Sequence, residues 1–412
     1  MKERPDVGRE SLCSQMEKLI VGPLKAVAIP TLIIIDALDE CKDEEPASAI
    51  LSILSRYVDQ IPVVKFFITG RPEARIRSVF RLESLAPITE ALKLHDVKPE
   101  TVDKDIELFF RTQLASLTKN RSDLDLVEGW PSSSDVRILC KKAAGFFIYA
   151  STVAKFIDSK TNSPVERLAL ITSLPQSAVG PGRSAVDQLY NKVLQQAFCD
   201  TDPGASQDHL RFQTVVGTIV LIFNPLSIRG LSELLGYNTH QVCSTIRPLH
   251  SLLLVPEGTE DPIRVFHKSF PDFLLDPARC EDERFYVDPS GHHVEILLAC
   301  LRLMERRLKK NMCNLDDHAA LSEVKDLSAR KKDHIGDALE YACQFWTKHL
   351  QGIPHSSPNT VEVQKAIDQF FTKHLLHWIE ALALMRNLSV GVHAMNDVDQ
   401  WYNLVSDGLD VC

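Results

Sequence analysis

The sequence predicts an α/β region built on a parallel sheet, followed by a much longer all-helical region. Two strand patterns, residues 31–35 and 63–69, flank an amphipathic helix pattern at residues 47–58. Strand, helix and strand in this order indicate a parallel pair, because parallel strands need a long crossover between them. After residue 99, apolar residues recur mostly at helical spacing. The 412 residues exceed what one hydrophobic core serves, so we expect several domains.

The composition is that of a globular protein inside the cell. Hydrophobic residues make up 44% of the chain, and the net charge of −9 gives no general attraction to nucleic acids or anionic membranes. The 10 cysteines contain no C-x-x-C pair, so we expect reduced thiols. No apolar stretch is long enough to span a bilayer. We therefore predict a cytoplasmic protein with neither nucleic acid nor membrane as partner.

In the α/β region, each expected helix or strand has its own sequence pattern. A helix is expected at residues 12–20, before Gly22-Pro23. The four large apolar residues Leu32-Ile33-Ile34-Ile35 are typical of a central strand covered on both faces. A helix should begin at Pro46, and a third strand is expected at residues 91–94.

The second region changes character between residues 225 and 266. Two short helices around Gly236 precede two apolar segments joined by a turn, which predicts a helix-turn-helix followed by a β wing. DNA binding is one interpretation of this pattern. The expected recognition helix offers only Arg247 as a fixed positive charge, so we favour a module that packs against protein.

Long amphipathic helices return after residue 291. One segment there is rich in basic residues, which we interpret as a solvated helix face. Its members are Arg302, Arg306, Arg307, Lys309 and Lys310.

Three acids, Asp36, Asp39 and Glu40, follow the first strand directly. Open α/β sheets bind ligands at the carboxyl ends of their strands, and neighbouring carboxylates repel one another unless a cation offsets them. Binding of a magnesium-bound triphosphate is one explanation for three neighbouring carboxylates. Asp36 would hold the ion, while Asp39 or Glu40 would orient or deprotonate water. The alternative is an acidic turn that begins the next helix.

The second strand ends in Gly70-Arg71, which places a cation on the same edge of the sheet as Asp36. Arg71 could contact a γ-phosphate, because a guanidinium binds phosphate oxygens bidentately. A salt bridge to Asp39 or Glu40 would use the same geometry without nucleotide. The phosphate-binding loop G-x-x-x-x-G-K-[ST] has no match anywhere in the chain.

Residues 32–41 and 67–73 resemble the Walker B and sensor 1 motifs of NACHT-domain NTPases, and most closely those of fungal NLR-like proteins of the STAND class. Residues 267–274, His-Lys-Ser-Phe-Pro-Asp-Phe-Leu, are similar to the motif that follows the winged helix in that family. The resemblance covers roughly residues 10 to 400. It implies ATP or ADP with magnesium as cofactor. Asp36 would then be the metal ligand, Asp39 and Glu40 the catalytic acids, Arg71 a nucleotide contact and His267 a β-phosphate contact.

The resemblance also implies a domain order. It starts with an incomplete P-loop NTPase-type sheet in a partial NACHT nucleotide-binding domain at 1–125. A helical subdomain at 126–205, a winged-helix domain at 206–290 and a C-terminal helical domain at 291–412 follow.

The missing Walker A loop leads us to expect a truncated, nucleotide-binding-deficient signalling regulator. It would be related to fungal innate immunity or incompatibility proteins and would act through protein partners or self-association. Catalysis is not expected, although the chemistry of the family would be ATP or GTP hydrolysis. One alternative is a functional ATPase switch whose Walker A loop is supplied upstream or by another chain. The other is a non-catalytic helical interaction scaffold.

Overall fold

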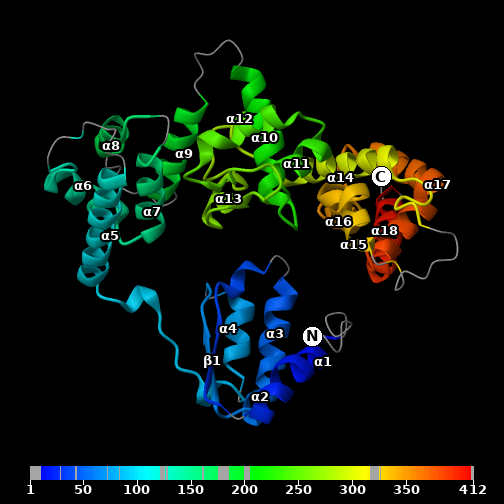
Figure 1. Cartoon of the computed structure of the whole chain (residues 1–412), viewed down its shortest axis with the longest axis horizontal. Helices are drawn as coiled ribbons and strands as arrows, with labels where there is room; N and C mark the ends of the chain where they lie inside the picture. Colours follow the sequence, from blue (N-terminus) through cyan, green and yellow to red (C-terminus); the bar gives the residue numbers. More distant parts are fainter. Residues whose placement is uncertain are drawn as a thin grey trace. The chain divides into compact units, whose positions relative to one another are not determined.

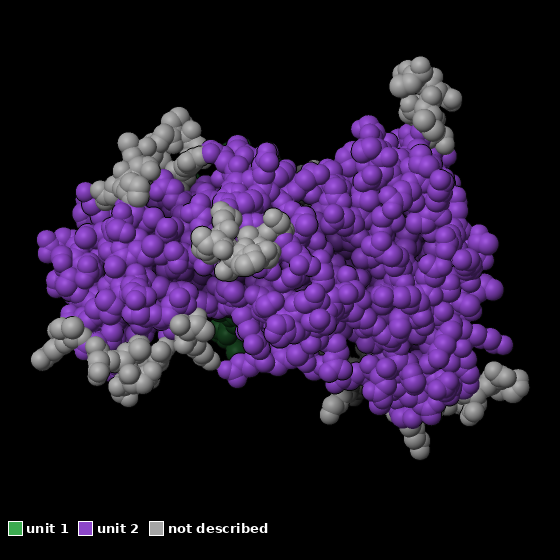
Figure 2. Space-filling model, turned by 90° about the horizontal axis from the view of Figure 1, so that it is seen from above, with its two compact units in different colours: residues 1–98 green, residues 99–412 purple. Residues whose placement is uncertain are grey.

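The computed structural model consists of two compact units, residues 1–98 and residues 99–412, which Figure 2 shows in different colours. The structure describes residues 11–27, 29–41, 44–71, 73–82, 84–120, 126, 129–159, 162–174, 185–198, 205–315, 324 and 326–409.

The first unit contains a two-stranded parallel sheet, which confirms the predicted strand pairing. Strand β1 (Thr31–Ile35) pairs with β2 (Val64–Ile68), and helix α3 (Glu44–Tyr57) makes the crossover between them. Helix α4 (Ala74–Phe80) follows β2, and α3 and α4 lie on one side of the sheet (Figure 1). The smaller elements of this unit are α1 (Leu12–Met16), a π-helical turn Glu17–Val21, α2 (Gly22–Val27) and 3-10 turns at Leu38–Glu40, Val58–Gln60, Ala86–Ile88 and Leu94–Asp96.

The first helix does not end before Gly22-Pro23 as expected, because α2 continues from Gly22. Two expectations for the strands of this unit are also wrong. The first strand is not covered on both faces: its burial alternates, and Leu32 and Ile34 are 60% and 64% exposed. Residues 91–94 form no strand, and Leu92 and Leu94 are exposed. An apolar run favours extended backbone locally, but it does not supply a strand to pair with. Among the described residues, no further strand pairs with β1 or β2.

In the described residues, the second unit begins with helices α5 to α9. Helix α5 (Pro99–Asn120) packs on α6 (Ser133–Ala143) and α7 (Phe147–Ile157), and α8 (Pro164–Ser173) and α9 (Ala185–Ala197) complete the group. Because α5 lies in this unit, the structure groups residues 99–120 with the helices rather than with the sheet. The division of the chain into four domains stays a prediction.

Two short helices and a small β ribbon lie where the sequence predicts them. Helix α10 (Ala205–Leu221) is followed by α11 (Ile228–Leu235) and α12 (Thr239–Ile246). Gly236 ends α11 with a φ of 74°, a left-handed conformation that favours glycine. Strands β3 (Leu253–Leu254) and β4 (Arg264–Val265) then pair antiparallel. An isolated bridge joins Ser227 to Pro262, so the ribbon is tied to the start of α11.

The remaining helices complete one continuous core that extends from α5 to the C-terminal helix. Trp346 and Trp378 are among its largest fully buried side chains. None of the helices in the described ranges is both long and apolar enough to cross a membrane. These last helices are α13 (Ser269–Leu274), α14 (Pro289–Arg307), α15 (Leu327–His334), α16 (Gly336–Gln351), α17 (Thr360–Leu384) and α18 (Leu388–Leu409).

Candidate functional site

The pairing of β1 with β2 brings the two predicted motifs to one edge of the sheet. Ile35 lies opposite Ile68, so the residues that follow them, Asp36 and Thr69, leave the sheet side by side. The backbone N–H of Thr69 donates to the carbonyl of Ile35 at 3.0 Å, and that of Leu38 donates to the carbonyl of Thr69 at 2.9 Å. The loop after β1 is therefore attached to the end of β2.

Thr69 connects the two motifs through its side chain. Its hydroxyl donates to Oδ1 of Asp36 and accepts from the backbone N–H of Ala37 at 2.8 Å. Ala37 has a φ of 53°, which is uncommon for a residue with a side chain and turns the backbone sharply after Asp36. The Asp36 side chain is exposed, so its carboxylate is accessible to a cation. No sequence pattern had assigned a role to Thr69.

Asp39 and Arg71 form a second contact between the same two loops. The backbone N–H of Arg71 donates to Oδ1 of Asp39 at 3.0 Å, and Nε of Arg71 lies 3.6 Å from Oδ2. Asp39 is only 7% exposed, whereas the Arg71 side chain is 44% exposed. Gly70 gives this carboxylate room, because a Cβ there would lie 3.3 Å from Oδ1 of Asp39. The salt bridge expected as the alternative to a nucleotide contact is therefore present.

The three acids do not act as one ligand set. Asp36 contacts Thr69, Asp39 contacts Arg71, and Glu40 is exposed at the end of a 3-10 turn. In the described part of the chain, no three His, Cys, Asp or Glu side chains are grouped so that they could hold a metal ion. Asp36 could supply one oxygen ligand to magnesium, an ion usually bound by one or two carboxylates plus substrate phosphates. The other ligands would have to come from the phosphates and water.

His267 lies in the second unit, between β4 and α13. Its Nδ1 accepts from the backbone N–H of Ser269 at 3.1 Å and is 2.7 Å from the Ser269 hydroxyl. That hydroxyl is 2.7 Å from the hydroxyl of Tyr190, whose pKa is raised to about 12 by burial. Nδ1 is thus an acceptor, and the proton of the neutral ring is on Nε2. A common site for His267, Asp36 and Arg71 stays a prediction, because they lie in different units.

Comparison with known proteins supports the resemblance inferred from the motifs. The family model "Nephrocystin 3, N-terminal" matches residues 1–71, which include Asp36 and Arg71. The chain is also 22% identical over 392 residues to vegetative incompatibility protein HET-E-1 of Podospora anserina. The chain is a relative of fungal NLR-like proteins. The alignment covers 90% of this chain but only 26% of HET-E-1, so this chain corresponds to a part of the longer protein. No solved structure matches.

Proposed function

We propose that this chain is a cytoplasmic signalling regulator of the fungal NLR-like type, related to incompatibility proteins, that acts through protein partners or self-association. The edge formed by Asp36, Thr69 and Arg71 would be the magnesium and γ-phosphate side of a NACHT-type nucleotide site. The observation that carries this proposal is the parallel register of β1 and β2, which places an exposed carboxylate and a half-exposed guanidinium at the same ends of neighbouring strands.

The second unit supports the regulatory part of the proposal. We infer that α10, α11, α12 and the β3–β4 ribbon form a winged-helix module, because the order of elements and the Ser227 to Pro262 bridge fit that arrangement. The protonated Nε2 of His267 would be the donor to a β-phosphate of ADP. In this proposal, nucleotide state decides how the module packs.

We propose that these 412 residues bind nucleotide weakly. Asp36 and Arg71 can meet the metal and a terminal phosphate, but the sequence has no Gly-rich loop with its lysine and hydroxyl. Each charge-assisted hydrogen bond contributes about 1.5–3 kcal/mol, so the loss of three such contacts weakens binding by roughly a thousandfold or more. Hydrolysis is not expected for the same reason.

Calorimetric titration with ATP and ADP in the presence of magnesium tests the proposal. We expect dissociation constants weaker than about 100 μM, with any residual binding lost on Asp36→Asn. Lys65, an exposed residue near the amino end of β2, offers a control, because Lys65→Gln removes one charge at the end of the strand opposite the site and should leave that residual binding unchanged. Affinity tighter than about 100 μM would contradict weak binding.

A second candidate function, a non-catalytic interaction scaffold, is favoured by the contact between Asp39 and Arg71. If this contact is only structural, Arg71→Ala will lower stability without any nucleotide-dependent change. A partly exposed ion pair of this kind contributes about 0.2–1 kcal/mol. Hydrogen exchange of residues 31–41, measured with and without ATP, separates the two candidates. If ATP increases the protection of these amides in the natural chain but not in Arg71→Ala, the result supports the nucleotide site.

A further inference from the structure

The basic segment, which begins on α14 and continues past its end at Arg307, is not a uniform solvated helix face. Arg307 is used within the protein: its guanidinium contacts the Glu233 carboxylate and donates to the carbonyl of His334 at 2.9 Å. Arg302, earlier on the same helix, is exposed and makes no hydrogen bond or ion pair with any residue that the structure describes. The two arginines therefore differ: Arg307 is held by two contacts within the protein, whereas Arg302 is exposed and affects a described residue only through its charge. A hydrogen bond from His292, helped by this charge, lowers the pKa of Glu295.

Arg302 lines a pocket between the end of α11 and α14. The pocket has a volume of about 250 Å³. One wall is apolar and the other is charged. Its lining residues are Leu234, Leu235, Gly236, Arg302, Glu305 and Arg306.

The charged wall has a net positive charge. Glu305 accepts from Nε2 of Gln369 at 2.7 Å and lies 3.4 Å from Nζ of Lys373, contacts that lower its pKa and keep it ionised. Lys373 offsets that negative charge. Arg306 uses Nη2 to donate to the Glu233 carbonyl at 3.3 Å. Besides the His292 hydrogen bond, the Arg302 guanidinium helps to lower the pKa of Glu295, but Arg302 makes no hydrogen bond with a residue that the structure describes. Two guanidinium groups thus lie opposite the apolar wall of the pocket.

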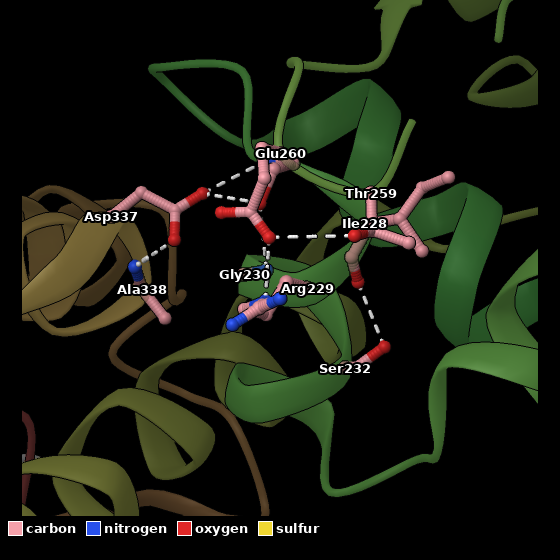
Figure 3. A network of polar contacts seen from close by, with 9 residues as sticks. Ile228, Arg229, Gly230, Ser232, Thr259, Glu260, Asp337 and Ala338 are labelled. Atoms are coloured by element: carbon pink, nitrogen blue, oxygen red, sulfur yellow. Dashed lines mark hydrogen bonds and ion pairs between the residues drawn. The ribbon is translucent and has the colours of Figure 1, made fainter. Parts of the chain in front are cut away.

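The apolar wall is held in place because α11 is held at both ends. Figure 3 shows Asp337 of α16 beside Gly230 at the N-terminal end of α11. Asp337 accepts from the backbone N–H of Ser227 at 3.1 Å and from the Ser227 hydroxyl at 2.6 Å. Gly230 is needed there, since a Cβ would lie 2.5 Å from Oδ2 of Asp337. Glu233, near the other end, contacts Arg307. A carboxylate at the N-terminus of a helix also complements its dipole.

We propose that this pocket binds an acidic, apolar peptide segment of a protein partner. One apolar side chain would fill the pocket chiefly against Leu235, because Leu234 is only 2% exposed, and a neighbouring carboxylate would pair with Arg302 and Arg306. The volume is smaller than that of pockets for drug-sized ligands, which run from about 300 to 1,000 Å³, and suits a single side chain. Guanidinium groups bind carboxylates bidentately, which gives the segment a fixed direction.

Charge complementarity favours a peptide over nucleic acid. The chain as a whole has a net charge of −9, so a long polyanion is repelled outside this pocket, whereas a short segment meets only the local positive charge. The apolar wall also offers no favourable contact to a phosphate backbone. The proposal goes beyond the nucleotide site, since every residue that lines the pocket lies in the second unit.

Fluorescence anisotropy with a fluorescein-labelled Glu-Leu-Glu-Leu-Glu peptide tests the proposal. We expect saturable binding, and a loss of about tenfold in affinity on Arg302→Gln, the value of one charge-assisted hydrogen bond. Lys310→Gln is the matched control: it removes the same charge from an exposed residue that does not line the pocket, and should change affinity by less than about twofold. Two further peptides, with Gln for Glu or Ser for Leu, should each bind more weakly.

Three results would overturn the proposal. One is an absence of saturable binding up to about 1 mM peptide. Another is an equal loss of affinity in Arg302→Gln and Lys310→Gln, which would indicate diffuse attraction. The third is a single-stranded oligothymidylate that binds as tightly as the peptide and with the same dependence on Arg302. Circular dichroism of both variants verifies that they are folded.

Discussion

The two units differ in how completely they cover their apolar side chains. In the first unit, α3 and α4 pack on one face of the sheet, while Leu32, Ile34 and Phe67 are more than half exposed on the strands. In the second unit, helices enclose a continuous core in which Trp346 and Trp378 are 0% and 1% exposed. A fully buried large side chain contributes about 1.5–3 kcal/mol. We therefore expect the second unit to be the more stable one.

The two proposed sites follow the same division. The nucleotide edge is built on the strands of the less covered unit, whereas the peptide pocket lies between helices of the better packed one. The two units can be followed separately, because all 4 tryptophans of the chain lie after residue 98. Tryptophan fluorescence then reports the second unit, and hydrogen exchange of residues 31–35 and 64–68 reports the first.

The largest expected effect comes from Trp378→Ala. The indole is 1% exposed, and its N–H donates to the carbonyl of Cys343 at 2.9 Å. We expect the free energy of unfolding of the second unit to fall by about 3–5 kcal/mol in urea titrations followed by the remaining tryptophans. Exchange of the β1 and β2 amides should be unchanged. Equal loss of protection in the sheet would show that the two units unfold together.

Acid should destabilise the second unit specifically. Burial, with the nearby His292, lowers the pKa of His293 from 6.5 to about 4, and its Nδ1 is 2.8 Å from Nδ1 of His349. The unfolded state then binds the extra proton first, so stability is full above pH 6.5 and falls as the pH drops toward 4. The loss reaches at most about 3 kcal/mol. Urea titrations between pH 7 and pH 4 measure it, and a slope that persists unchanged in His293→Gln would assign it to other groups.

A double-mutant cycle at the start of α11 sharpens the comparison within the second unit. Asp337→Ala removes the acceptor for Ser227 and should cost about 1 kcal/mol. Gly230→Ala places a methyl group against the Asp337 carboxylate and should cost about 1–3 kcal/mol. The double variant should cost less than the sum, because the methyl group then has room. Strict additivity would show that the two residues do not interact.

The smallest effect is expected from Phe67→Ala in the first unit. Phe67 is 57% exposed, so its removal should cost less than about 1 kcal/mol in the exchange of β2 amides. Leu51→Ala is the control in the same unit: Leu51 is 0% exposed, and its loss should cost about 2–5 kcal/mol. If Phe67→Ala costs as much as Leu51→Ala, the exposed face of the sheet is covered in solution and the two units do not differ in the way described.

Part of the candidate site could be predicted because its signal is local. A strand pattern followed by Asp36, and another followed by Gly70-Arg71, are visible in the sequence, and parallel pairing then places them at one edge. The contact of Thr69 with Asp36 was missed because it joins residues 33 positions apart. The expected strand at residues 91–94 was wrong because a strand needs a pairing partner that an apolar run does not identify.

The sequence by itself determined the helices, the parallel strand pair and the polar residues at the strand ends, because periodicity and turn residues act on neighbouring backbone. Only the tertiary structure decided which faces are covered, and which arginine of α14 pairs with Glu233 and which lines the pocket. Burial and ion pairing depend on segments far away in the chain. The arginines of the basic segment look alike in the sequence, so the sequence does not show which distant residues each one contacts.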